Sequence, residues 1–205
     1  FDPFLRKWFD EHAFKSVTTD DFLAFLRREL LARNPGKLTE AELAAWIAGP
    51  GLPDTAVPAA SPRLAAVDVA REAWLERRTA AAELDTAKWI TQEWVHFLEG
   101  LPADIDATRL LELDGAFRFT GTPNGEIAQR WYPITVRAGY FEARPALAQF
   151  LRKVGRRKLI LPSYVALAET PDGLAFARQV LQQASAGYHP ITRGAVQAAL
   201  DAAPR

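Results

Sequence analysis

A cluster of basic residues is the part of this sequence best suited to bind an anion. Five cations lie within seven positions: Arg152, Lys153, Arg156, Arg157 and Lys158. Cations in the last turn of a helix are ordinarily explained by the helix dipole and by solvation. This cluster continues past the helix end expected at Gly155, into a loop where an arginine fork and an ammonium group can converge on one carboxylate or phosphate. The spacing predicts an anion site that suits the carboxylate end of a peptide.

The surroundings of the cluster argue against nucleic acid and membrane as partners. Only Phe150 and Tyr164 lie near enough in sequence to stack on bases. Lys plus Arg and Asp plus Glu both total 25, so no overall field draws the chain to nucleic acid or acidic lipid. No apolar stretch approaches the roughly 20 residues of a membrane span. We expect neither partner, and we expect a cytoplasmic protein, with the periplasm and secretion left open.

The other reactive residue types form no catalytic or metal-binding pattern. Without cysteine there is no thiolate nucleophile and no disulfide. None of His12, His96 and His189 begins an H-E-x-x-H pair, which would place two imidazoles on one helix face for zinc, so we expect them to pack or to cap helices. Four serines fall where caps or helix starts are expected, and none lies in a G-x-S-x-G turn: Ser16, Ser61, Ser163 and Ser185. We expect no catalytic residue, no metal ligand and no cofactor in this chain.

The elements that must position the basic cluster are helices. Helical periodicity recurs from end to end, and alternating strand patterns are hard to find. The predicted fold is all-α, with about ten helices paired in two layers. They cover approximately residues 2–13, 18–33, 39–47, 62–78, 87–99, 105–114, 123–139, 143–154, 162–169, 172–186 and 193–201.

Local signals fix several of these boundaries. Thr18 with Asp21 and Thr39 with Glu42 predict helix starts that resemble capping boxes. Residues 49–62 are rich in proline and glycine, which indicates an extended connection. It is either a boundary or an ordered crossover, and we favour the crossover because three short helices make a small core. The six tryptophans are expected to pack in the core.

Five segments resemble a known family in order and spacing. They are A-F-K-S-V-T-T-D-D-F ending at Phe22, W-I-A-G-P-G-L-P at 46–53, N-G-E-I-A-Q-R-W at 124–131, G-R-R-K at 155–158 and H-P-I-T at 189–192. Together they resemble the C-terminal helical domain of leukotriene A(4) hydrolase and its aminopeptidase relatives. The resemblance spans nearly the whole chain and implies one domain over residues 1–205, a two-layer right-handed α-α superhelix of the ARM/HEAT kind.

The resemblance also implies a function. A zinc-bearing catalytic domain is expected upstream of residue 1, so zinc belongs to that domain, and this chain closes the substrate channel. Arg156 and Lys158 match the pair that holds the free carboxylate of a short peptide in the family. The sequence departs from the family at Arg157 and at Leu161, where an apolar and a basic residue, respectively, are often found. The expected partners are the catalytic domain and a peptide.

Two other functions compete with this one. A free-standing helical scaffold could bind a protein partner on a concave face, and the basic cluster could bind another anion or a nucleic acid. The chain contains no methionine, even at position 1, which favours a fragment of a longer enzyme over a free-standing scaffold. Arginine is the more frequent basic residue, which is associated with a bacterial source.

Overall fold

The computed structural model describes residues 1–58 and 60–203. These residues form eleven α-helices, four short 3-10 turns and no strand, which confirms the all-α prediction. Contacts divide the chain into two compact units, Phe1–Ala60 and Ser61–Arg205. Each unit is therefore described by itself, and a single domain over residues 1–205 stays a prediction. Among the described residues, no helix is both long and apolar enough to cross a membrane.

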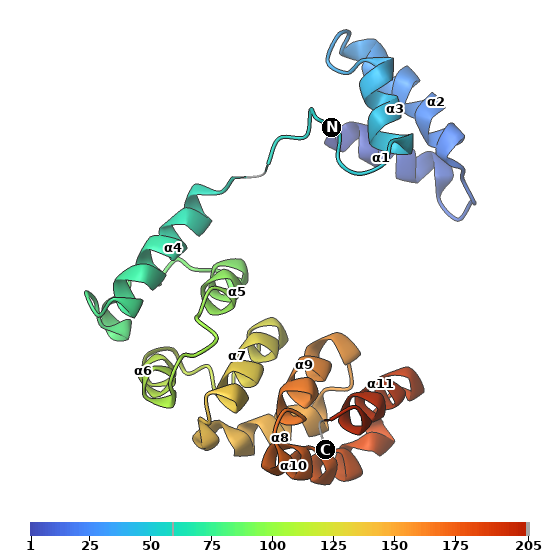
Figure 1. The fold of residues 1–205 in the computed structure, drawn as a ribbon. Helices are drawn as coiled ribbons and strands as arrows, with labels where there is room; N and C mark the ends of the chain where they lie inside the picture. Colours follow the sequence, from blue (N-terminus) through green and yellow to red (C-terminus); the bar gives the residue numbers. More distant parts are fainter. Residues whose placement is uncertain (59, 204–205) are drawn as a thin grey trace. The chain divides into compact units, whose positions relative to one another are not determined.

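The first unit contains α1 (Asp2–His12), α2 (Thr19–Glu29) and α3 (Glu40–Ala48), drawn in blue in Figure 1. Its small core consists mostly of aromatic and leucine side chains: Phe4, Trp8, Phe25, Leu26 and Leu43. Both predicted capping boxes are present, at Thr18 with Asp21 and at Thr39 with Glu42. Each hydroxyl satisfies a free N–H of the first turn, so these two helix starts are stabilised locally.

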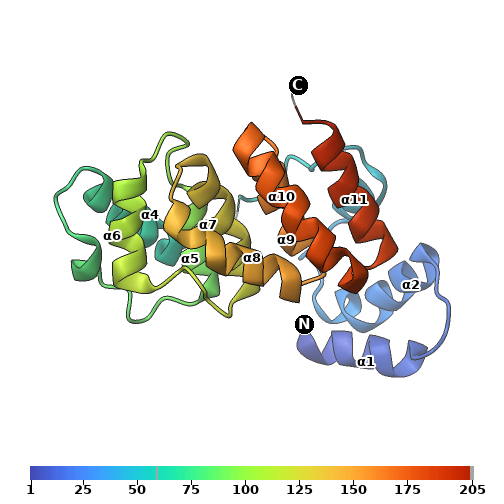
Figure 2. The ribbon, with the colours of Figure 1, turned by 90° about the horizontal axis from the view of Figure 1, so that it is seen from below.

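The second unit stacks eight helices in two layers, as Figures 1 and 2 show. One layer contains α5 (Thr91–Glu99), α7 (Gly125–Arg137), α9 (Arg157–Leu167) and α11 (Pro190–Asp201), and α4 (Pro62–Leu75) packs against α5. The other contains α6 (Ala107–Phe117), α8 (Arg144–Lys153) and α10 (Pro171–Ala184). Ser61 caps α4 and Pro62 opens it, as the sequence predicts. The two-layer prediction is confirmed for this unit, and its likeness to ARM or HEAT repeats stays a prediction.

The tryptophans confirm the core prediction with one exception. Trp74 and Trp131 are fully buried in the second unit, and Trp8 is buried in the first. In contrast, the side chain of Trp46 is 48% exposed, so its prediction as a core residue is wrong. Trp46 lies on α3, which buries only Leu43. The small core of the first unit does not cover a second large side chain from this helix.

The three histidines pack or cap, as predicted. The ring of His12 lies on Trp8, and its Nδ1 is 2.9 Å from the Trp8 carbonyl oxygen. His96 Nε2 lies 2.8 Å from a carboxylate oxygen of Asp68. His189 Nδ1 accepts a hydrogen bond from Ile191 N at 3.2 Å. It thereby caps α11, which begins at Pro190 rather than at residue 193.

The start of α9 differs most from its prediction. The sequence analysis places it at Pro162, but the helix begins five residues earlier, at Arg157. A proline in a helix interior lacks the N–H that would bond to the carbonyl four residues before it. Pro162 therefore leaves the Lys158 carbonyl without its helical donor. Ser163, predicted at a helix start, is instead fully buried in the helix interior.

Candidate functional site

The predicted anion site lies where a short loop meets the start of a helix. Arg156 is the N-cap residue of α9 and lies in the loop. Arg157 and Lys158 lie in the first turn of the helix, so the loop prediction is wrong for these two residues. Leu159 and Ile160 turn toward the core, and Ile160 is fully buried, which explains why the helix extends back to Arg157. All three cations are exposed.

The electrostatics of this helix start favour an anion. The first turn of α9 contains no acidic residue, and no side chain caps its free N–H groups. The N-terminal end of a helix carries a partial positive charge from those groups. Three basic side chains add to that charge, although cations are ordinarily unfavourable at this end. Backbone N–H groups and cations together make a potential binding site for a carboxylate or phosphate.

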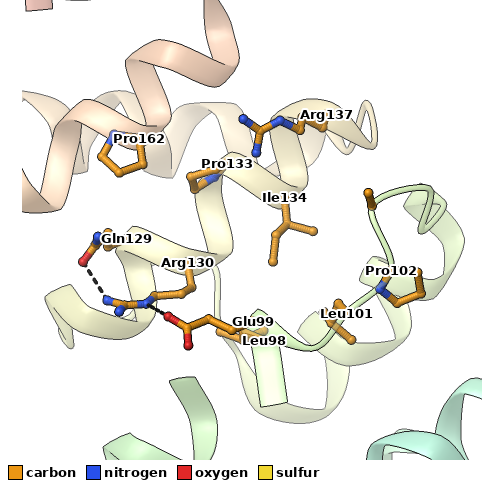
Figure 3. Close-up of a pocket in the computed structure, with 11 residues that line it drawn as sticks. Leu98, Glu99, Leu101, Pro102, Gln129, Arg130, Pro133, Ile134, Arg137 and Pro162 are labelled. Carbon is orange, nitrogen blue, oxygen red and sulfur yellow. Dashed lines mark hydrogen bonds and ion pairs between the residues drawn. The ribbon is translucent and has the colours of Figure 1, made fainter. Parts of the chain in front are cut away.

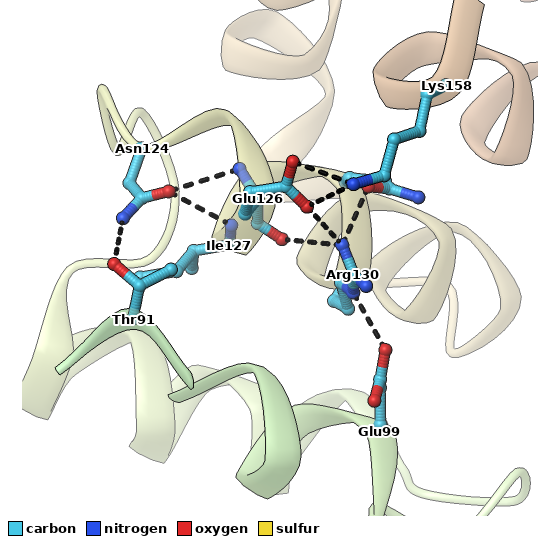
Figure 4. A network of polar contacts seen from close by, with 8 residues as sticks. Thr91, Glu99, Asn124, Glu126, Ile127, Arg130 and Lys158 are labelled. Atoms are coloured by element: carbon cyan, nitrogen blue, oxygen red, sulfur yellow. Dashed lines mark hydrogen bonds and ion pairs between the residues drawn. The ribbon is translucent and has the colours of Figure 1, made fainter. Parts of the chain in front are cut away.

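The start of α7 lies beside this site. Asn124 caps α7, and its Oδ1 accepts hydrogen bonds from Glu126 N at 3.1 Å and Ile127 N at 3.5 Å. The side-chain Nδ2 of Asn124 donates a hydrogen bond to Thr91 Oγ1 at 2.9 Å. This bond ties α7 to the first residue of α5 (Figure 4). The backbone that carries Glu126 is therefore held from two directions.

A glycine allows α7 and α9 to approach closely here. A Cβ added to Gly125 would lie 3.0 Å from Leu159 Cδ1, which is tighter than an ordinary van der Waals contact. A larger residue at position 125 would require the Leu159 side chain to shift. This close approach brings Lys158 within reach of Glu126.

Charged residues of three helices form one connected network (Figure 4). Lys158 Nζ lies 2.9 and 3.0 Å from the two carboxylate oxygens of Glu126. Glu126 Oε2 also accepts from Arg130 Nη1 at 2.8 Å, and Arg130 Nε donates to Glu99 at 2.9 Å. The hydrogen bond from Lys158, followed by that from Arg130, holds the pKa of Glu126 below its ordinary value. The four charges alternate in sign and balance.

A groove runs from this network along α5, α7 and α9. One hollow, of about 440 Å³, lies between the end of α5 and α7 and is lined mainly by apolar side chains (Figure 3), including Leu98, Leu101, Pro133, Ile134 and Pro162. A second hollow, of about 480 Å³, is lined by Arg137, Arg157, Lys158, Leu161, Pro162 and Val165. The two share Arg137 and Pro162. The groove therefore has an apolar part and a cationic end.

Only one of the two predicted site residues lines the groove. Lys158 lines the groove and is paired with Glu126, whereas Arg156 is not among the lining residues, and Arg157 is. No ion pair of Arg156 or Arg157 is found within residues 1–58 and 60–203. The groove also includes two arginines that the sequence analysis missed, Arg130 and Arg137. A signal was available for one of them, because Glu126 and Arg130 have the i,i+4 spacing of a helical ion pair.

Two of the groove arginines, Arg130 and Arg137, are already neutralised by neighbouring acids. Arg137 makes a bidentate pair with Glu169, with nitrogen–oxygen distances of 2.7–3.0 Å. Over the described part of the chain, no group of three or more side chains of the metal-ligating types could hold a metal ion. Among the described residues of this region, the cations without an acidic partner therefore lie at the α9 start, at Arg156 and Arg157.

Comparison with known proteins identifies the family of this chain. The family model "Leukotriene A4 hydrolase, C-terminal" matches residues 89–200. Leucine aminopeptidase 2 of Eremothecium gossypii is 30% identical over 98% of this chain, which covers 35% of that protein. Mouse aminopeptidase B is 27% identical over 82% of this chain and 27% of its own length. Both relatives are eukaryotic, so a bacterial source stays a prediction.

Solved structures share the fold. Yeast LTA4 hydrolase in complex with bestatin matches with a TM-score of 0.73 and 24% identity, over 98% of this chain and 35% of that one. This chain thus spans about a third of the length of the relatives it matches. The family match extends from just before α5 into α11, and it includes Glu126, Arg156 and Lys158. This chain therefore belongs to the family of leukotriene A4 hydrolase C-terminal domains.

Proposed function

We propose that this chain is the non-catalytic C-terminal part of a zinc-dependent aminopeptidase. In this proposal its α5, α7 and α9 face forms one wall of the substrate channel, and the α9 start binds the C-terminal carboxylate of a short peptide. The observation that carries the proposal is the uncapped start of α9 with its three cations, which lies inside the family match. The aminopeptidase names of the relatives support the reaction class.

The residues of this chain have a binding role and no catalytic one. A peptide needs its amino end and scissile bond placed at the catalytic centre, and its carboxylate lies at the opposite end. Contacts of that carboxylate with Arg156 and Lys158 fix the position of the whole peptide, which converts remote binding energy into orientation at the reacting bond. Arg157 lines the groove next to Lys158 and offers a further cation.

The zinc ion belongs, in this proposal, to a catalytic domain outside this chain. The described residues include no group of ligands that fits it, so no step of the reaction is assigned to them. The proposed partners are that catalytic domain and a peptide with a free carboxylate. When bound in the catalytic domain, zinc supplies the activation of the peptide bond and of water.

The test uses the longer protein that carries this domain. Arg156→Ala should lower kcat/KM for a tripeptide about tenfold to a hundredfold, because a charge-assisted contact contributes about 1.5–3 kcal/mol. The same variant should leave the hydrolysis of an aminoacyl anilide unchanged, because that substrate has no carboxylate. Arg178→Ala, which removes an exposed arginine from α10, serves as the matched control. Equal losses on both substrates would count against carboxylate binding.

A further inference from the structure

The protein's own carboxylate already occupies one of the proposed contacts. Both oxygens of Glu126 bind the ammonium group of Lys158, at 2.9 and 3.0 Å. A peptide carboxylate that reaches Lys158 therefore meets a cation that is already paired. It can bind there only by sharing the ammonium group with Glu126 or by displacing Glu126.

The geometry allows displacement. The side chains of Lys158 and Glu126 are 52% and 37% exposed, and an ion pair so open to water is weak. Glu126 also keeps a second cation when it leaves Lys158, because its Oε2 accepts from Arg130 Nη1 at 2.8 Å. Arg130 is further held by Glu99 at 2.9 Å, so it stays in place to receive Glu126.

The backbone of Glu126 does not have to move. Asn124 binds the N–H groups of Glu126 and Ile127 and is itself held by Thr91. Gly125 keeps this turn against Leu159. Only the side chain of Glu126 has to rotate, so the exchange is local.

We infer that Glu126 is a specificity-determining residue, which competes with the peptide carboxylate for Lys158; this inference rests on the proposed function. A carboxylate ligand replaces the charge of Glu126 at Lys158 and leaves the ammonium paired. A peptide amide has no charge to offer and cannot displace Glu126. Glu126 therefore lowers the affinity for a carboxylate at Lys158, whereas an uncharged peptide amide gains nothing from Lys158 whether or not Glu126 is present.

The experiment measures peptide binding by the full chain of residues 1–205. Trialanine and trialanine amide are titrated into the ¹⁵N-labelled protein, and the shifts of the backbone amides at the start of α9 are followed. Glu126→Gln should bind trialanine about twofold to fivefold more tightly than the wild type, as expected for release from an exposed ion pair. Binding of the amide should not change.

Two further variants control for charge and for folding. Glu142→Gln removes the same charge at an exposed position before α8, and it should behave as the wild type. Glu126→Asp keeps the charge but shortens the side chain, which weakens the contact with Lys158. Its affinity for trialanine should lie between those of the wild type and Glu126→Gln, and it provides the comparison if the glutamine variant does not fold.

The possible outcomes separate this inference from the proposed function. In one outcome the wild type prefers trialanine to its amide, and Glu126→Gln has the same affinity as the wild type for each ligand. This result refutes the competition by Glu126 but leaves the carboxylate site standing. If Glu126→Gln binds both ligands more tightly by the same factor, the inference fails as well. If no protein prefers trialanine, both the inference and the carboxylate site are refuted.

Discussion

The starts of α7 and α9 lie side by side and are built in opposite ways. At α7, Asn124 caps the free N–H groups, and Glu126 places a negative charge in the first turn. At α9, Arg156 provides no side-chain cap, and Arg157 and Lys158 place positive charges in the first turn. Each cation at this end interacts unfavourably with the helix dipole, which lowers the stability of the helix by about 0.3–1 kcal/mol.

In the function that we propose, the α7 start serves stability and the α9 start serves binding. The residues at α7 satisfy the needs of the helix and fix its position on α5. The residues at α9 do not satisfy the needs of the helix, and the carboxylate ligand that we propose would account for their arrangement. The Lys158–Glu126 pair joins the two starts, so the acid that suits α7 partly neutralises α9.

The largest predicted effect comes from disrupting the capped start of α7. Asn124→Ala removes the α7 cap and the hydrogen bond to Thr91, and it should lower the free energy of unfolding by about 1–2 kcal/mol. Urea unfolding followed by circular dichroism measures it. Thr170→Ala, which removes the single N-cap bond of α10, should cost less. If Asn124→Ala lowers the free energy of unfolding no more than Thr170→Ala does, Asn124 does not hold α7 against α5 as we describe.

The second prediction concerns a substitution that gives the start of α9 a cap like that of α7. Arg156→Asp gives α9 a side-chain cap and an acid at its positive end, so it should raise the free energy of unfolding by about 0.5–1.5 kcal/mol. The same change should abolish the preference for trialanine over its amide. Arg178→Asp, in the middle of α10, should give no gain in stability. Destabilisation by Arg156→Asp would show that the arginine is needed for the fold.

The smallest predicted effect concerns the link between the two starts. Lys158→Ala should raise the pKa of Glu126 toward its ordinary value of 4.5, which a ¹³C NMR titration of the carboxyl carbon measures. Because the pKa is lowered in the folded state, the pair stabilises the fold above the unfolded pKa, and this contribution is lost as the pH falls through the lowered pKa. The variant should therefore lose less stability in acid than the wild type. An unchanged pKa would mean that Arg130 alone holds Glu126.

Local chemistry made much of the fold predictable. The capping boxes at Thr18 and Thr39 and the serine–proline start at Ser61 involve residues a few positions apart, so the sequence contains the whole interaction. The start of α9 was missed for the opposite reason. Pro162 by itself predicts a helix start. The packing of Ile160 in the core instead favours a helix that begins at Arg157.

The candidate site was only partly predictable. The basic cluster is visible in the sequence, and so is the i,i+4 pair of Glu126 and Arg130. Lys158 and Glu126 are 32 positions apart, and only the packing of α7 on α9 brings them together. The exposure of Trp46 could not be predicted either, because it depends on how little core the first unit has to offer.

The most direct test of the central claim is a crystal structure of the longer protein with a slowly hydrolysed tripeptide analogue bound. The account predicts that the peptide carboxylate lies within hydrogen-bonding distance of Arg156 and Lys158, with Glu126 turned toward Arg130. A peptide bound with its carboxylate away from the start of α9, while Glu126 still holds Lys158, would contradict it.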